Sequence, residues 1–279
     1  MKILVTGTNG QVGHALLGAL TEHEIISVNR QQCDLKNLDQ IERLIDDHQP
    51  DLIINPAAYT KVDQAEDEAE LAFKINADAP KLMAKKAREY NISFIHFSTD
   101  FVFDGEKKGA YSEGDLTNPL GVYGSSKLAG EEAIQEVGGQ VYIFRTSWVY
   151  SNIGHNFYLT MKHLSQERDE LNVVSDQLGV PTSSDFIAMQ IHKIIPRLNL
   201  AKPGIFHLVP DGYCSWYEFA KEIIIKTTPG FDITRIHPIK AEHYPSKAKR
   251  PLNSILGNTH IKSAFMLEFE DWQSELKKI

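Results

Sequence analysis

The N-terminal segment constrains the fold of this chain more than any other, because a short apolar run leads directly into three spaced glycines. Residues 2–6 (KILVT) predict a buried strand, and residues 7–13 (GTNGQVG) follow at once. The stretch 12–21 then repeats apolar side chains at helical spacing. A strand, a glycine turn and a helix in this order are typical of a Rossmann-type dinucleotide-binding domain.

Each glycine of the turn answers a separate steric requirement. We expect Gly7 to permit a tight turn, Gly10 to let the backbone approach a pyrophosphate, and Gly13 to let the helix pack close to the sheet. The helix N-terminus would offer free N–H groups and the positive end of its dipole to the phosphates. The predicted cofactor-binding residues of this segment are therefore Gly7, Gly10, Gln11, Val12 and Gly13.

Strand and helix patterns alternate through the first half of the chain and loosen after about residue 148. Expected strands lie at 24–28, 51–55, 93–98, 141–145, 172–174 and 204–208. Expected helices lie at 38–48, 65–90, 124–137, 157–167, 184–198 and 216–227, and 244–251 is expected to be a loop. Such alternation produces parallel βαβ units and an α/β, doubly wound sheet.

Two structural units follow from this change of pattern. We predict a dinucleotide-binding Rossmann domain over residues 1–150 and a smaller α+β lobe that binds the substrate over residues 151–279. Parts of 180–200 and 205–210 are expected to pack onto the first domain. No flexible linker separates the two units.

Composition excludes several classes of function. The net charge of −8, without a basic face, argues against nucleic acid as a partner. Cys33 and Cys214 are far apart and the histidines are scattered, so we expect no bound metal. Because the sequence shows no signal peptide and no long apolar run, we also expect a cytoplasmic protein without a membrane partner.

Residues after the second predicted strand bear on the choice of cofactor. Asn29 and Arg30 stand where the commonest fingerprint has an acid that holds the ribose 2′-hydroxyl. An acid repels a 2′-phosphate, whereas Asn29 tolerates one; Arg30 either pairs with it or is a solvated surface residue. We therefore expect NADPH or NADH, with NADPH favoured. Further cofactor contacts are expected from Asp34, Leu35, Ala57, Ala58, Tyr59 and Thr60.

The fourth predicted strand and the helix after it carry residues suited to carbonyl reduction. The strand ends in Ser98-Thr99-Asp100, and Tyr123 and Lys127 lie four residues apart, on one helical face. A ketone that receives a hydride needs a proton. We expect Tyr123 to supply it, Lys127 to lower the pKa of Tyr123, and Thr99 to hold the carbonyl oxygen. Tyr123 and Lys127 are also expected to contact the cofactor.

The combination of these motifs resembles the extended short-chain dehydrogenase/reductase family. Matching segments run from residue 7 to about 254: GTNGQVG, NPAAYTKVDQAE, STDFVFDG, NPLGVYGSSKLAGE, FRTSWVY, SDQLGVPT and RPLNS. SWVY and DQLGVPT point to the branch that reduces dTDP-4-keto-6-deoxy sugars in dTDP-L-rhamnose synthesis. The resemblance implies hydride transfer from NAD(P)H to the C4 ketone of a sugar nucleotide.

The resemblance also implies a set of substrate-binding residues. Thr99 and Asp100 would contact the sugar and Trp148 would line its pocket, while Asn156, Arg250 and Ser254 would lie around the nucleotide diphosphate. Some family members are described as dimers bridged by Mg²⁺ through glutamates. His14 and Ala15 occupy that stretch here, so we expect no metal bridge, and a homodimer stays open.

Two alternative functions stay open at this point. One is a non-catalytic NAD(P)-binding regulatory subunit on the same fold, like that of methionine adenosyltransferase. The other is a reductase of a different 4-keto sugar nucleotide.

Overall fold

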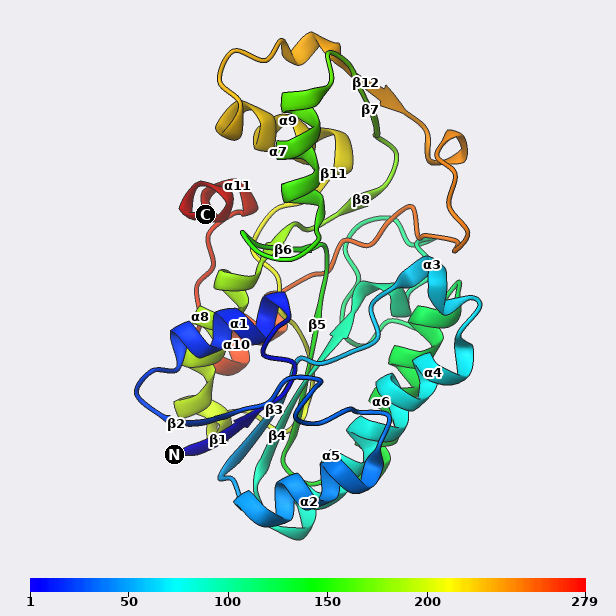
Figure 1. Ribbon diagram of the computed structural model, residues 1–279. Helices are drawn as coiled ribbons and strands as arrows, with labels where there is room; N and C mark the ends of the chain where they lie inside the picture. Colours follow the sequence, from blue (N-terminus) through cyan, green and yellow to red (C-terminus); the bar gives the residue numbers. More distant parts are fainter.

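The computed structural model describes all 279 residues and is built around one parallel sheet of six strands in the order β10-β5-β4-β3-β1-β2 (Figure 1). The strands are β1 (Lys2–Val5), β2 (Glu24–Ser27), β3 (Leu52–Asn55), β4 (Ser93–Thr99), β5 (Val141–Thr146) and β10 (Gly204–His207). Strands β3 and β5 are buried along their whole length, as expected when helices cover both faces of a parallel sheet. The predicted doubly wound α/β fold is confirmed. The strand order reverses at β1, which places the ligand crevice beyond the carboxyl ends of β1 and β3.

Helices cover both faces of this sheet (Figure 1). One face packs against α1 (Gln11–Ala19), α8 (Ser184–Ile194) and α10 (Thr259–Phe265). The other packs against α2 (Leu38–His48), α5 (Ala79–Glu89) and α6 (Val122–Val137). Because α8, β10 and α10 follow residue 151, the large domain recruits elements from the second half of the chain.

A smaller lobe lies beyond the carboxyl ends of the strands (Figure 1). Its core packs α7 (Phe157–Glu167), α9 (Trp216–Thr227) and α11 (Trp272–Lys278) around Tyr150 and Phe219. Strand β7 (Leu171–Val174) pairs with β12 (Ile236–Ile239), β6 (Val149–Tyr150) with β9 (Thr182–Ser183), and β8 (Leu178–Gly179) with β11 (Cys214–Ser215). Short 3₁₀ turns are η2 (Asp100–Val102), η3 (Ile195–Leu200), η4 (Ile233–Arg235) and η5 (Ala241–His243).

The single helix predicted at 65–90 is wrong. The structure has α3 (Val62–Ala65), α4 (Ala69–Phe73), a π-helical turn η1 (Lys74–Asp78) and then α5. The π turn contains Asn76, whose side chain binds the Tyr59 backbone at 2.8 and 3.1 Å and the Ser126 hydroxyl at 3.0 Å. These tertiary bonds favour a local geometry that apolar periodicity does not report. The helix predicted at 184–198 stops at Ile194 and continues as a 3₁₀ turn containing Pro196, whereas those at 38–48, 157–167 and 216–227 are confirmed.

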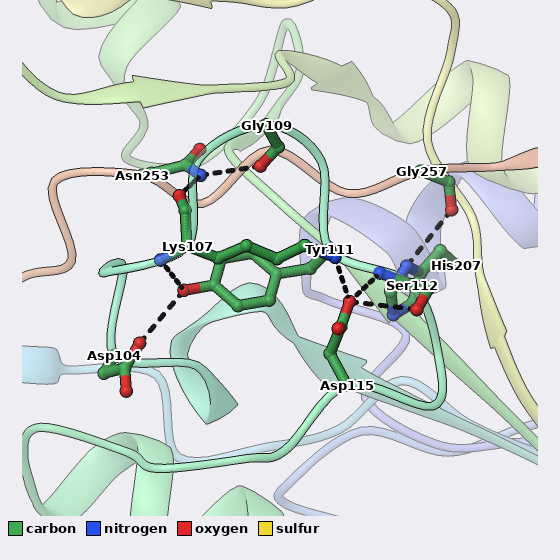
Figure 2. Close-up of polar contacts among 9 residues, drawn as sticks. All are labelled: Asp104, Lys107, Gly109, Tyr111, Ser112, Asp115, His207, Asn253 and Gly257. Carbon is green, nitrogen blue, oxygen red and sulfur yellow. Dashed lines mark hydrogen bonds and ion pairs between the residues drawn. The ribbon is translucent and has the colours of Figure 1, made fainter.

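The loop between β4 and α6 is anchored to the C-terminal segment (Figure 2). The Tyr111 hydroxyl donates to Asp104 Oδ1 at 3.0 Å and accepts from the Lys107 N–H at 3.1 Å. Asn253 Nδ2 donates to the carbonyl oxygens of Lys107 at 2.6 Å and Gly109 at 2.8 Å. These bonds fix the segment that precedes Ser254 against the loop that follows Asp100.

Two glycines of α1 give a matched test of the glycine turn. A Cβ on Gly13 would lie 2.3 Å from the Gly7 carbonyl oxygen, whereas a Cβ on Gly18 would meet nothing within 4 Å. We expect Gly13→Ala to lower the free energy of unfolding by about 2 kcal/mol through overpacking. Gly18→Ala should raise it by roughly 0.5–1 kcal/mol. Urea titrations measure both, and changes of equal sign would contradict the steric argument.

Candidate active site

The glycine turn brings the end of β1 against the segment that follows β3. Gly7 has φ +60°, and a Cβ there would lie 2.9 Å from both Cα and Cβ of Ala57. The Gly10 N–H donates to the Gly7 carbonyl at 2.9 Å. The expected close approach at Gly13 is to this carbonyl and not to a strand of the sheet.

No side chain caps the N-terminus of α1. Its N-cap, Gly10, provides no side-chain cap, and the first turn carries no acidic residue. The free N–H groups and the helix dipole therefore suit a phosphate. Gln11 Oε1 accepts from Ser151 Oγ at 2.8 Å and from Asn156 Nδ2 at 2.9 Å, which ties this turn to the small lobe. Val12 packs at the edge of the core.

The residues expected to contact the adenosine end of the cofactor have three different structural roles: one stabilises a turn, one is an exposed cation and one is buried in the core. Asn29 Oδ1 accepts from the backbone of Gln31 at 2.9 Å and of Gln32 at 3.3 Å, so it stabilises a turn. The Arg30 side chain is 73% exposed, with Nε 3.8 Å from Asp34 Oδ2. Leu35 is buried in the core beneath α2.

The segment after β3 is held from below by Asn76. Ala57 and Ala58 are half-buried, Tyr59 is buried and Thr60 is exposed. The Tyr59 hydroxyl donates to Glu68 Oε2 at 2.8 Å, and burial together with that carboxylate raises the pKa of Tyr59 to about 12. Asn76 joins this segment to Ser126 on α6, next to Lys127.

The first turn of α6 is positioned by two contacts from distant segments. Glu66 Oε1 accepts from the Val122 N–H at 2.9 Å, and a Cβ on Gly121 would lie 2.7 Å from that oxygen. A Cβ on Gly124 would lie 2.2 Å from the Phe101 carbonyl oxygen. Tyr123, between these contacts, packs edge-on against the Phe101 ring. Sequence reasoning missed Glu66, although it lies in the NPAAYTKVDQAE segment.

Tyr123 lies beside Thr99 and Asp100, and its pKa is raised and not lowered. Burial raises the pKa of Tyr123 to about 12; the Thr99 hydroxyl opposes this and Asp100 adds to it. The expectation that Lys127 lowers the pKa of Tyr123 is wrong, because the ammonium is held elsewhere. Tyr123 is therefore a protonated phenol at neutral pH, which is the state required of a proton donor.

Lys127 is 2% exposed and is anchored on β4. Its Nζ donates to the Phe97 carbonyl at 2.6 Å and lies 3.1 Å from His96 Nε2. Burial lowers the pKa of Lys127 to about 8, and Glu131 opposes that shift. Lys127 therefore changes between its charged and its neutral form close to pH 8.

Asp100 carries an unpaired oxygen in a buried position. Thr99 Oγ1 donates to Asp100 Oδ1 at 3.0 Å, while Oδ2 is buried without a hydrogen-bond partner. Burial raises the pKa of Asp100 to about 6, and the neighbouring Ser254 and Thr99 hydroxyls oppose the shift. A buried carboxylate with a free oxygen suits a hydroxyl ligand.

A cavity of about 620 Å³ lies in the small lobe, and its lining includes Asn156, Gln177, Trp216, Lys249 and Arg250. The Arg250 guanidinium donates from Nη2 to Asp63 Oδ2 at 3.0 Å, and its Nε is buried without a partner. The Asn156 amide is already engaged, since Nδ2 donates to Gln11, Ser151 and Ile153 and Oδ1 caps α7. Arg250 is thus the better placed of the two to bind an anion.

Trp148 does not line this cavity; Trp216 does. The two indoles are stacked, with centroids 3.5 Å apart and planes 7° apart. A Cβ on Gly179 would lie 2.4 Å from Trp148 Cε2, so the backbone at Gly179 packs directly against the Trp148 indole. Trp148 also has φ +47°, a strained value for a bulky residue. Sequence reasoning missed Trp216.

A family model and a curated relative both match this chain over nearly its whole length. The model of the family described as "RmlD substrate binding domain" matches residues 1–279. A dTDP-4-dehydrorhamnose reductase from Burkholderia thailandensis is 39% identical over 98% of this chain and 96% of that protein.

Two solved structures agree over nearly the whole chain. The dTDP-4-dehydrorhamnose reductase of Bacillus anthracis, in complex with NADP, superposes with a TM-score of 0.93 at 34% identity, covering 99% of this chain and 97% of that one. A dTDP-4-dehydrorhamnose reductase from Clostridium acetobutylicum superposes with a TM-score of 0.92 at 39% identity, covering 100% of this chain and 98% of that one. Separately, no helix here has the length and apolar character needed to cross a bilayer.

The raised pKa of Asp100 predicts a pH-dependent stability. Because the folded-state pKa of about 6 exceeds the unfolded value, the contribution of Asp100 is present at low pH and is lost as pH rises through 6. Asp100→Asn should therefore stabilise the protein more at pH 8 than at pH 5, by about 1 kcal/mol in urea titrations.

Asp115 supplies a control of opposite sign. The Lys107 ammonium lowers the pKa of Asp115 to about 2, so Asp115→Asn should cost most stability at neutral and high pH. A pH-independent effect of Asp100→Asn would contradict the assignment.

Proposed function

The chain belongs to the family described as the RmlD substrate binding domain, and we propose that it is an NADPH-dependent oxidoreductase that reduces the C4 keto group of dTDP-4-dehydro-L-rhamnose to give dTDP-L-rhamnose. The observation that carries the proposal is the placement of a protonated Tyr123 beside Thr99, at the same sheet edge as the uncapped N-terminus of α1. The full-length similarity to dTDP-4-dehydrorhamnose reductases supports the substrate class.

The chain's own residues fit a dinucleotide cofactor. Gly7 and Gly13 let the turn fold tightly against Ala57 and against itself, where a Cβ would clash, and the α1 N-terminus has no side-chain cap. Gly7, Gly10, Gln11, Val12 and Gly13 would hold the pyrophosphate, with Ala57, Ala58, Tyr59 and Thr60 along the nicotinamide side. When bound, NADPH supplies the hydride. NADPH is favoured because Arg30 is an exposed cation at the adenosine end, and a relative is solved with NADP. Use of NADH as well stays within the proposal.

Tyr123 would give its phenolic proton to the sugar C4 oxygen. An alkoxide is a stronger base than a phenolate, so a phenol with a pKa of about 12 remains a competent acid. Thr99, which interacts with Tyr123 and Asp100, would hold the carbonyl oxygen in line with that proton. Lys127 would act through the cofactor and not on the phenol: its Nζ, held by the Phe97 carbonyl and His96, would hydrogen-bond the nicotinamide ribose.

The sugar nucleotide would extend from this edge into the cavity of the small lobe. Arg250 would pair with the diphosphate, since its guanidinium lines the cavity and keeps one unpaired N–H. Asp100 and Ser254, side by side, would accept and donate hydrogen bonds to sugar hydroxyls. Trp216 would form the apolar wall, with Trp148 stacked behind it.

Replacing the proton donor tests the reaction. With dTDP-4-dehydrorhamnose and NADPH, the protein should oxidise NADPH, and Tyr123→Phe should lower kcat by roughly 10²–10⁴-fold while NADPH still binds. Tyr90→Phe is the control, because that hydroxyl bonds Asp46 between α2 and α5, away from the site. NADPH oxidation only with other 4-keto sugar nucleotides would redirect the substrate assignment. If NADPH is not oxidised with any 4-keto sugar nucleotide, the alternative of an NADP-binding regulatory protein is favoured.

Removing the exposed cation tests cofactor choice. Arg30→Ala should raise the KM for NADPH about tenfold and leave the KM for NADH nearly unchanged, since a charge-assisted bond to the 2′-phosphate is lost. Arg43→Ala on α2 removes an equal charge from an exposed position and should change neither. Equal changes for both cofactors in Arg30→Ala would show that this side chain does not read the 2′-phosphate.

A further inference from the structure

A buried row of polar side chains crosses the sheet beneath the proposed reaction site. His96 on β4 is 1% exposed, with Nε2 3.1 Å from Lys127 Nζ and Nδ1 3.1 Å from Asn55 Nδ2. Asn55 Oδ1 in turn accepts from Thr6 Oγ1 at 2.5 Å. Asn55 and His96 are register partners on adjacent strands. The row therefore links the residue that follows β1, together with strands β3 and β4, to α6, and the proposed reaction itself assigns no role to His96.

We propose that His96 is a positioning residue for Lys127, accepting a hydrogen bond from the ammonium at Nε2 and thereby holding Nζ at the sheet edge in its charged form. This rests on the proposed function, because its effect on turnover requires the Lys127 ammonium to take part in the reaction. The contact itself does not depend on the reaction.

The chemistry of imidazole supports an acceptor role. Burial and the adjacent Lys127 both lower the pKa of His96 well below its usual range, so the ring is neutral. A neutral imidazole has one donor and one acceptor nitrogen. An acceptor Nε2 requires a protonated Nδ1, which donates to the Asn55 amide oxygen when that amide is turned by half a rotation. Asn55 Nδ2 then donates to Thr6 Oγ1, so the amide and both imidazole nitrogens are hydrogen-bonded.

The same row also accommodates a neutral Lys127. In that case Nε2 carries the proton and donates to Nζ, and Nδ1 accepts from Asn55 Nδ2 in the orientation seen here. The charged form keeps the stronger bond, because hydrogen bonds to ionised donors are about twice as strong as neutral ones. His96 thus keeps Nζ in place in both states and favours the ammonium.

The other charges near Lys127 do not replace this contact. Glu131, one turn along α6, forms a bidentate pair with Arg145 on β5, at 2.6 Å between Nη2 and Oε2. Tyr123 is a neutral phenol, and Asp100 lies beside Tyr123 and Thr99. The direct partners of the ammonium are therefore the Phe97 carbonyl and His96.

The test compares His96→Phe, which removes the acceptor, with His96→Gln, which retains one. In His96→Phe the ammonium loses a partner in a dry site, so its pKa falls further. The basic limb of the kcat profile should move down by about one pH unit, and kcat at pH 8 should fall about fivefold. The KM for the sugar nucleotide should change little. His96→Gln should keep the limb close to its wild-type position.

A second measurement is independent of turnover and of the cofactor. Imidazole ¹⁵N spectra of the wild-type protein below pH 8 should show His96 with protonated Nδ1 and unprotonated Nε2. A protonated Nε2 under those conditions would overturn the proposal. So would a fall in kcat of equal size in both variants without movement of the basic limb, which is the result expected of a purely structural residue. The NMR result stands if His96→Phe fails to fold.

Lys127→Met separates failure of this inference from failure of the proposed function. If Lys127→Met turns over like the wild type, the role of Lys127 in the reaction is wrong, whatever His96 does. If Lys127→Met is inactive and His96→Phe leaves the basic limb in place, only the inference about His96 is wrong.

Discussion

Close contact between helix glycines and backbone carbonyls is the constraint on which the site depends. A Cβ on Gly13 would lie 2.3 Å from the Gly7 carbonyl oxygen, one on Gly124 2.2 Å from that of Phe101, and one on Gly130 2.1 Å from that of Asn76. The first contact seats α1, and the other two seat α6. Any side chain at these positions would push a helix away from the sheet edge. The uncapped N-terminus of α1 and the phenol of Tyr123 would then no longer face the same crevice.

Burial, and not pairing of opposite charges, dominates the electrostatics at this edge. It raises the pKa of Tyr123 and Asp100 and lowers that of Lys127 and His96. In each case the low-dielectric surroundings favour the neutral form. A proton donor that stays protonated and a lysine whose charge depends on its hydrogen bonds both follow from this dry environment. The weight that we place on His96 has the same origin.

The short helix α3 connects the two lobes. Asp63 accepts from the Ala248 N–H at 3.0 Å and pairs with Arg250, and Asp67 pairs with Lys247. Glu66, at the end of the same helix, caps α6 beside Tyr123. The loop that lines the cavity of the small lobe and the helix that carries the proposed proton donor are therefore both held by residues 63–67. An anion that binds Arg250 would compete with Asp63 for the guanidinium.

The sequence by itself determined the fold class, the glycine turn and the pairing of Tyr123 with Lys127 on one helical face. These depend on local periodicity and on steric rules that act within a few residues. Only the tertiary structure decided what surrounds them: Glu66 on the N-terminus of α6, Asn76 in a π turn, His96 against Lys127, and Trp216, stacked on Trp148, on the cavity wall. It also reversed the expected pKa shift of Tyr123. The physical reason is common to all of these: a hydrogen-bond partner or a desolvated environment comes from segments that are distant in sequence, and residue order carries no signal of which segments will meet.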